Sequence, residues 1–388
     1  MIARTKVNYS FRDILSAFFV PEKGTVHRDI LRGLLSEMFD TVNIHLAPSG
    51  RGALLAILRN LPHKVVIVPA YTCKAVVEAV LLAGKRLRHV EVEDDGFNLD
   101  AAQLEPMLNS DCVVIATHQF GICCDIDRIR VLCQTSGAYL IEDVAAAFGS
   151  RFEGKLTGTF GDAAFFSFDS TKFINVPLKA GFFIIKDPLL FSAVRLSCET
   201  FFRSMTFTQK LLLLAKATFM LIIEHPFLYR IFHTFFFDLR GRYTMDGPDL
   251  KPTLGPSMVQ SFAEWQAMIA GRQLRSLHAL IQRRQFMYES YRTKLAGCKS
   301  FSLPPIDHAG EWACARFPIR VHGDKIAFYR EACKRGVDMA FSFTFIDCPP
   351  ELLRSKALAS SVLDLPFYGK LSDVDLNKTV AVLKDIDK

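Results

Sequence analysis

Apolar, β-branched segments alternate with helix-like segments between Pro48 and Asp187, and this alternation constrains the fold more than any other feature. Strands separated by helical patterns imply a mostly parallel sheet with both faces covered. The expected strands are 64–68, 87–92, 111–117, 138–142, 163–168 and 181–185. The expected helices are 26–39, 53–60, 74–83 and 126–136. The chain is therefore predicted to be an α/β protein.

The length of 388 residues suits two domains. Residues 1–247 are expected to form the large domain, which contains a very apolar insert at 201–242. Gly247 and Pro248 mark the expected boundary, and residues 248–388 are expected to form a small C-terminal α+β domain.

The apolar insert is rich in phenylalanine and leucine, and most of its charges are basic. Its longest uncharged run is well short of the roughly 20 residues that a membrane-spanning helix needs. Two interpretations stay open. The insert is either a buried helical hairpin in a dimer interface, or an amphipathic element that lies on a membrane with Lys and Arg toward anionic headgroups.

Charge and cysteine content restrict the partners and the compartment. The net charge of +7 is modest and is not gathered into long basic runs, so nucleic acid is not an expected partner. An anionic small substrate or an anionic membrane face fits better. The ten cysteines show no zinc-binding spacing, so no metal site is expected, and they suit a reducing compartment. Without a signal-peptide pattern at the N-terminus, a cytoplasmic location is predicted, peripheral at the inner membrane face if the insert binds lipid.

Two candidate motifs point to the binding of an anion and of a ring nitrogen. The small-residue turn from Ser49 to Ala53 opens a predicted helix, where free backbone N–H groups and the helix dipole favour a phosphate. Asp143 directly follows a predicted strand, at the edge where ligands bind in open α/β sheets. Its carboxylate is a candidate partner for a protonated ring nitrogen. An ordinary loop-to-helix turn and a helix N-cap are the structural alternatives.

Two more motifs supply a candidate amine and a candidate substrate contact. Ser167 and Lys172 lie just past another predicted strand, in the run FFSFDSTK. A lysine in an apolar, partly dry site has a lowered pKa and becomes competent to form a Schiff base. A solvated surface lysine is the alternative. His118, in the run THQFG, is a candidate to face a substrate or to be a satisfied structural histidine.

Together, these motifs resemble the DegT/DnrJ/EryC1/StrS family of sugar aminotransferases, which depend on pyridoxal 5′-phosphate (PLP). The runs VPAYTCKAVVEAVLLAG, HQFGICCDID and GTFGDAAFFSFDSTK carry the resemblance in that order. It extends from about Pro48 to Asp187 and resumes near Glu264 and at LDLPFY, residues 363–368. It implies the aspartate aminotransferase-like fold, PLP fold type I, with a mostly parallel central sheet and a small C-terminal α+β domain.

The resemblance also implies roles for individual residues. Lys172 would bind the PLP aldehyde and later shuttle a proton, and Asp143 would pair with the pyridine nitrogen. Ser167 and the backbone at Gly50 and Arg51 would hold the cofactor phosphate. Members of the family transfer an amino group, usually from glutamate, to a keto-sugar linked to a nucleotide. They work as homodimers with the site at the subunit interface.

Some cofactor positions depart from the family pattern. Ala146 stands where the family usually has Gln or His, and Cys73 stands where an aromatic ring commonly stacks on the cofactor. Tyr71 is the candidate replacement for that ring. Arg51 replaces a usual Thr and would add a charged contact to the phosphate.

Substrate positions depart as well. Val259 and Ser261 replace the Asn-x-Arg that reaches the partner's site, and the substrate loop reads Ser-Phe-Thr-Phe at 342–345. These changes bear on the substrate more than on the cofactor. A PLP enzyme with a non-sugar or lipid-linked substrate, and a catalytically idle family member used for binding, stay open as alternatives.

Overall fold

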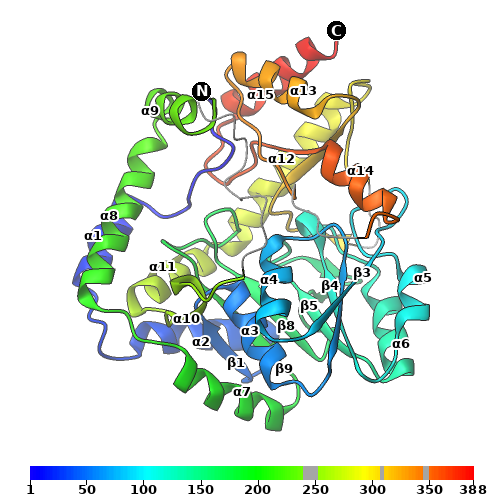
Figure 1. Cartoon of the computed structure of the whole chain (residues 1–388). Helices are drawn as coiled ribbons and strands as arrows, with labels where there is room; N and C mark the ends of the chain where they lie inside the picture. Colours follow the sequence, from blue (N-terminus) through cyan, green and yellow to red (C-terminus); the bar gives the residue numbers. More distant parts are fainter. Residues whose placement is uncertain (239–251, 306–309, 344–348) are drawn as a thin grey trace.

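The central element is a seven-stranded sheet in the order β1-β9-β8-β5-β4-β2-β3. The computed structural model describes residues 1–238, 252–305, 310–343 and 349–388 (Figure 1). Neighbouring strands from β8 to β3 run parallel, and β9 is antiparallel to both of its neighbours. The strands are β1 (Ile44–Ala47), β2 (Val65–Pro69), β3 (Arg86–Val90), β4 (Cys112–Thr117), β5 (Tyr139–Asp143), β8 (Ala163–Ser167) and β9 (Gly181–Ile185).

Both faces of the sheet are covered by helices, as the sequence predicted. Successive residues of each strand point to opposite faces, so strands that are apolar throughout present apolar side chains on both sides. On one face, Val113 and Ile115 pack with α3 (Gly50–Asn60), α4 (Lys74–Leu82) and α7 (Pro188–Phe201). On the other face, Val114 and Ala116 pack with α5 (Ala101–Leu104) and α6 (Ile126–Ser136). Farther along that second face, β8 and β9 pack with α2 (Val26–Phe39) and α11 (Glu264–Arg275). The predicted α/β class with a mostly parallel sheet is confirmed.

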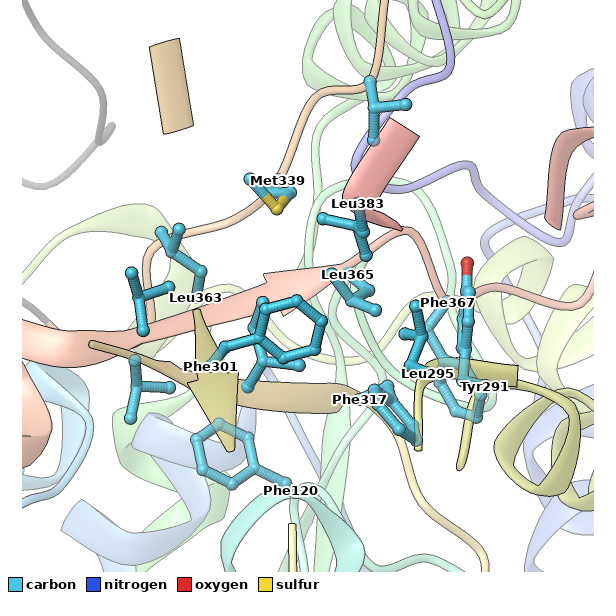
Figure 2. Packing of buried hydrophobic residues seen from close by; sticks show 14 of the residues in the cluster. Phe120, Tyr291, Leu295, Phe301, Phe317, Met339, Leu363, Leu365, Phe367 and Leu383 are labelled. Carbon is cyan, nitrogen blue, oxygen red and sulfur yellow. The ribbon is translucent and has the colours of Figure 1, made fainter. Parts of the chain in front are cut away.

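The small domain is built on an antiparallel sheet of β10 (Phe301–Ser302), β12 (Phe317–Val321) and β13 (Val362–Leu365). Figure 2 shows its core, in which Phe317, Leu363 and Leu365 meet Tyr291 and Leu295 of α12. Phe120 of the large domain belongs to the same cluster. The helices are α12 (Leu277–Leu295), α13 (Lys325–Lys334), α14 (Leu353–Ser361) and α15 (Asp373–Ile386).

The first long helix after the predicted domain boundary packs with the large domain. The predicted boundary at residues 247 and 248 lies outside the described residues. However, α11 packs inside the large domain, where Trp265 and Ile269 join the cluster under β8 and β9. The chain therefore contributes to the large domain as far as Arg275, and the small-domain packing begins with α12.

The described part of the insert forms α8 (Phe207–Ile223) and α9 (Pro226–His233), followed by one π-helical turn at Thr234–Asp238. α8 packs beside α1 (Phe11–Phe19) along one edge of the molecule (Figure 1). Within the described residues, no one helix has the length and apolar character to cross a membrane. α8 and the segment Pro226–Phe237 reach that threshold only in combination, and they bend by 104° at their junction.

A buried polar cluster, centred on Asp338, fastens α9 to the small domain. Arg4 donates to both carboxylate oxygens of Asp338, at 2.6 and 2.8 Å. The hydroxyls of Tyr229 and Tyr329 donate to the same carboxylate, at 2.5 and 3.0 Å. His233 of α9 lies 2.9 Å from the Tyr329 hydroxyl. This Asp338 cluster thus joins the N-terminal segment, the insert and the residues after α13.

Candidate active site

Three parallel strands end in polar residues at the same edge of the sheet. Thr117, Asp143 and Ser167 are the last residues of β4, β5 and β8, and Thr117 pairs directly with Asp143 in the strand register. Ligands of open α/β sheets bind at this carboxyl edge. A cavity of ≈ 440 Å³ lies there, which is a usual volume for a small-molecule site.

Of the eight candidate site residues proposed from the sequence, all except Tyr71 and His118 line this cavity. They come from four separate segments: the start of α3, the loop before α4, the end of β5 and the segment around the end of β8. They are Gly50, Arg51, Cys73, Asp143, Ser167 and Lys172.

Lys172 lies in the loop after β8, and its backbone N–H donates to the backbone carbonyl of Asp169 at 2.9 Å. Burial lowers the pKa of its amine, and the neighbouring Arg316 guanidinium lowers it further. A lowered pKa increases the unprotonated fraction of an amine, which is the form that attacks carbonyl carbons. The Lys172 amine is thus prepared for nucleophilic chemistry.

Asp143 is buried and lines the cavity. Burial raises the pKa of its carboxyl group, while the Ala145 N–H, which donates to it at 3.0 Å, and the charge of Lys172 oppose that rise. A buried carboxylate with so little compensation favours a cationic hydrogen-bond donor beside it.

The start of α3 faces the cavity opposite Ser167. The Ser49 hydroxyl accepts from the Gly52 N–H at 3.0 Å, and this N-cap leaves the N–H groups of Gly50 and Arg51 without an intrahelical acceptor. A side chain at position 50 would place its Cβ 3.1 Å from the Cβ of Ser167. Glycine therefore lets the helix start and Ser167 approach each other closely enough to hold one anion.

The Arg51 side chain is placed differently from the expected phosphate contact. Its guanidinium forms an ion pair with Glu78 of α4, which also lines the cavity. Because Glu78 already neutralises that guanidinium, its position does not support a charged phosphate contact by the Arg51 side chain. The expected contact by the Arg51 backbone agrees with the geometry of the helix start.

Tyr71 is not at the cavity wall. Its side chain is fully buried, and its hydroxyl donates to the backbone carbonyl of Ser342. Its ring packs against Phe120 and, at 5.4 Å between ring centroids, Phe343. The position of Tyr71 therefore does not agree with a stacking role; Phe343 is an aromatic side chain that does line the cavity.

His118 also lies away from the cavity, and its position favours the structural alternative. The ring is fully buried, its Nδ1 accepts from the Cys124 N–H at 3.3 Å, and its Nε2 lies 3.1 Å from Glu142. Because Nδ1 accepts, the proton is on Nε2 and is donated to Glu142. The expectation that His118 contacts a substrate does not agree with this geometry.

The HQFG run instead positions the segment that carries Arg316, a residue of the cavity wall. The Phe120 carbonyl accepts from the N–H groups of Ala315 and Arg316, at 2.9 and 3.3 Å. Gly121 has a φ of +104°, and a Cβ there would lie 2.5 Å from the Cα of Cys314. This close approach sets the segment that carries Arg316 against the large domain.

Arg316 is a cavity residue that sequence reasoning missed. Its guanidinium lies 2.8 Å from Asp364, and it also donates to Ser342 and, at 3.4 Å, to the Thr171 hydroxyl. Burial opposes its charge, but the Asp364 carboxylate outweighs burial and raises the pKa of Arg316. A permanent cation therefore faces the cavity beside Lys172.

Two threonines were missed as well. Thr72 and Thr117 line the cavity, and their buried hydroxyls have no hydrogen-bond partner among the described residues. Unpartnered buried hydroxyls are costly unless a ligand supplies the partner. Together with the amine of Lys172, the carboxylate of Asp143 and the anion cradle at α3, they fit an aldehyde-bearing, phosphorylated ring such as PLP.

Comparison with known proteins agrees with this arrangement. The model of the DegT/DnrJ/EryC1/StrS aminotransferase family matches residues 44–213 and 256–384. A GDP-perosamine synthase from Vibrio cholerae is 36% identical over 136 residues, which are 35% of either chain. A UDP-N-acetyl-3-dehydro-α-D-glucosamine 3-aminotransferase from Acidithiobacillus ferrooxidans is 34% identical over 143 residues, 36% of this chain and 39% of the relative. These matches span between one third and two fifths of the relatives' length.

Solved structures match over nearly the whole chain. The sugar aminotransferase CalS13 from Micromonospora echinospora has a TM-score of 0.75 at 19% identity, with 99% of this chain and 100% of that chain covered. The aminotransferase PseC from Helicobacter pylori has a TM-score of 0.77 at 16% identity, with 99% and 98% covered. These likenesses establish the fold, and the family model covers well over half of the 388 residues. The chain belongs to the DegT/DnrJ/EryC1/StrS aminotransferase family.

Proposed function

We propose that this protein is a PLP-dependent aminotransferase that moves an amino group from an amino donor, glutamate as in most of the family, to a keto-sugar nucleotide. The observation that carries the proposal is the meeting of Lys172, Asp143 and Ser167 with the start of α3 in one cavity. Each group is the type that PLP chemistry requires: an amine, a buried acid and an anion cradle.

The chain offers each part of the cofactor a distinct partner. Lys172 Nζ binds the aldehyde carbon, and Asp143 keeps the ring nitrogen protonated, which also relieves its own unfavourable burial. Ser167 Oγ and the N–H groups of Gly50 and Arg51 hold the phosphate. Cys73 and Ala146 also line the cavity and would lie beside the bound cofactor. When bound, PLP supplies the electron sink for bond breaking at the donor's α-carbon.

Lys172 and Arg316 divide the acid–base work and the positioning. Once its amine is released, Lys172 accepts the proton from the donor's α-carbon and returns it from Nζ during the transfer. Its lowered pKa increases the unprotonated fraction of that amine, which is the form that accepts a proton. Arg316 stays charged, because Asp364 supports it, and orients an anionic group of donor or acceptor.

The acceptor class rests on the relatives. A GDP-perosamine synthase and an aminotransferase of a UDP-linked keto-sugar are among the similar proteins. The cavity wall also carries Lys172, Lys179 and Arg316, and the last two are each paired with a carboxylate, Asp169 at 3.2 Å and Asp364 at 2.8 Å. We assign the acceptor as a nucleotide-linked keto-sugar on the basis of these relatives.

Two further parts of the proposal concern assembly and location. The protein is proposed to act as a homodimer, as its family does, and to be cytoplasmic. The nine cysteines in the described part of the chain form no disulfide bond, which supports a reducing compartment. A membrane surface, contacted through residues 201–242, is the other proposed partner. The observations that support this contact concern exposed helices outside the cavity.

The test is spectroscopic and uses the PLP-loaded protein. Addition of glutamate should convert the visible absorption of the lysine-bound cofactor into the near-ultraviolet absorption of pyridoxamine phosphate. A nucleotide-linked keto-sugar should then restore the visible band. The Lys172→Ala variant should lack the visible band, whereas Lys179→Ala, a matched lysine of the same cavity, should keep it.

The outcomes separate the proposal from its alternatives. A visible band that no amino donor changes would exclude transamination and leave the other PLP chemistries. Conversion by glutamate, followed by recovery only with a non-sugar or lipid-linked carbonyl, would overturn the acceptor assignment alone. If the protein stays colourless with excess PLP, it does not attach the cofactor, and the alternative of a catalytically idle family member used for binding is favoured.

A further inference from the structure

We propose that the exposed face of α1, α8 and α9 docks on an anionic lipid bilayer, with its apolar side chains at the boundary between headgroups and acyl chains. This outer face is defined by two side chains from each helix: Phe18 and Phe19, Leu212 and Phe219, and Phe227 and Ile231. The proposal does not depend on the chemistry in the cavity.

The apolar side chains of the outer face are unusually exposed. Phe19 is 73% exposed, Leu212 66% and Phe227 67%. Scattered exposed apolar residues are normal, but a contiguous group of large ones marks an interaction site. α1 and α8 lie side by side along one edge of the molecule, and α9 continues from α8 (Figure 1). The exposure therefore belongs to one region of the surface.

α8 is amphipathic in a way that composition alone does not reveal. Leu214, Ala217 and Leu221 are buried against the protein. Leu212 and Phe219 are exposed, and their spacing with Lys216 places all three on the opposite side of the helix. A helix that buries one apolar stripe and exposes a second one with a cation between has the pattern of an interfacial helix.

The charges of the outer face favour an anionic partner. Arg12 on α1, Lys216 on α8 and Arg230 on α9 are exposed. The acids of the same region are half-buried and face internal partners. Asp13 lies 2.8 Å from Arg272, Glu22 lies 3.3 Å from Lys210, and Glu224 accepts from the Val7 N–H at 2.6 Å. The three helices thus present cations, while their acidic groups are neutralised from within.

The same charges disfavour a second copy of the chain as the occupant. In a two-fold interface, the same patch meets itself. The exposed cations of the outer face would then approach the same cations of the partner, with the nearby acids already engaged. An anionic leaflet satisfies both the apolar side chains and the cations, and each basic residue near such a leaflet strengthens binding.

The experiment is flotation of the full, PLP-loaded chain with vesicles. One set contains phosphatidylcholine with phosphatidylglycerol, and the other contains phosphatidylcholine alone. We expect the protein to float with the anionic set and to remain mostly in solution with the neutral set. Changing Leu212 and Phe219 to Glu should reduce binding by at least about tenfold, and Lys216→Gln by roughly fivefold.

The matched control changes two exposed leucines outside the outer face. Leu189 and Leu196 of α7 are 82% and 62% exposed, and their change to Glu should leave flotation unaltered.

Light scattering of the Leu212 and Phe219 variant without lipid tests whether a second copy of the chain covers the outer face. If this variant dissociates an oligomer, the outer face is a self-interface and the lipid proposal fails. Failure of the wild type to float with anionic vesicles also overturns it. Neither result bears on the aminotransferase activity, which is measured separately.

Discussion

Two buried carboxylates, Asp143 in the cavity and Asp338 behind α9, have opposite surroundings. At Asp338, burial acts to raise the pKa, but Arg4 and His233 outweigh it and hold the pKa of Asp338 well below its usual range. At Asp143, burial is the dominant influence and raises the pKa. The first carboxylate is saturated by the chain's own donors, and the second is not.

This difference separates an anchor from a binding site. A buried charge costs several kcal/mol unless it is paired and hydrogen-bonded. The fold supplies those partners to Asp338, and this pairing stabilises the folded state. Asp143 receives the Ala145 N–H, but the described residues give no partner to the hydroxyls of Thr72 and Thr117, and a ligand can supply further donors and acceptors there. His233, Cys333 and Asp338 also place ligand-type atoms within 4.8 Å of one another, but Arg4 already occupies the carboxylate and supplies its counter-charge.

The largest expected effect follows removal of the cavity amine. Lys172→Ala should reduce turnover by about 10⁴-fold or more, because both the covalent attachment and the proton shuttle are lost. Its free energy of unfolding should not fall, because a partly desolvated charge is removed. Steady-state assays and urea unfolding measure both quantities. A Lys172→Ala enzyme with more than a tenth of wild-type turnover would contradict the assignment.

The second effect tests the anchor. Asp338→Ala leaves Arg4 buried without its counter-charge, so the free energy of unfolding should fall by about 3–5 kcal/mol. The turnover of the folded fraction should stay within about twofold, because Asp338 does not line the cavity. Urea unfolding measures the first quantity, and active-site titration with PLP corrects the second. An unchanged stability would show that the cluster does not anchor α9.

The third effect is the converse. Asp143→Asn should reduce turnover by about 100-fold, because the neutral amide no longer keeps the ring nitrogen protonated. The protein without cofactor should be as stable as the wild type or slightly more stable, since a buried charge has been removed. A clear loss of stability in this variant would place Asp143 with the anchors and weaken the comparison.

The smallest effect is in the pH dependence of stability, and its sign differs between the two acids. Asp338 has a depressed folded-state pKa, so its contribution is complete above the unfolded value of about 3.9 and is lost as the pH falls toward the folded value. The stability gap between wild type and Asp338→Asn should therefore narrow below about pH 4.

Asp143 has a raised folded-state pKa, so its charge destabilises the cofactor-free fold increasingly as the pH rises above about 4. The free energy of unfolding of Asp143→Asn should therefore exceed that of the wild type by an amount that grows as the pH rises. Urea unfolding of both variants between pH 3 and about pH 7 compares the two gaps. If the stability of the wild type relative to the Asn variant changes in the same direction for both acids as the pH rises, the contrast is refuted.

Sequence periodicity predicted most of the large domain, because a buried parallel sheet leaves runs that are apolar throughout. Helices α2 and α6 match the expected ranges, and five of the six expected strands lie within one residue at each end. The sixth, β3, begins one residue before the expected start and ends two residues before the expected end. The short edge strand β1 was not predicted, because the four residues IHLA carry almost no pattern. α1 was missed although Ser10 and Asp13 form a capping box.

The site was predictable where a residue ends a strand and not where the fold imports it. Asp143 and Ser167 were identified at strand ends, and the same rule would have favoured Thr117 over its neighbour His118. Arg316 carries no local signal, because its place depends on the contact between the Phe120 carbonyl and the small domain. Likewise, the composition of residues 201–242 indicated an apolar insert but not which side of α8 stays exposed.

The most direct measurement of the central claim is the position of the covalent bond to PLP. The protein is incubated with PLP, reduced with borohydride and digested, and the phosphopyridoxyl group is located by mass spectrometry. We expect the label on the peptide that contains Lys172, at that residue. A label at Lys179 or at surface lysines alone, or no label at all, would contradict the account.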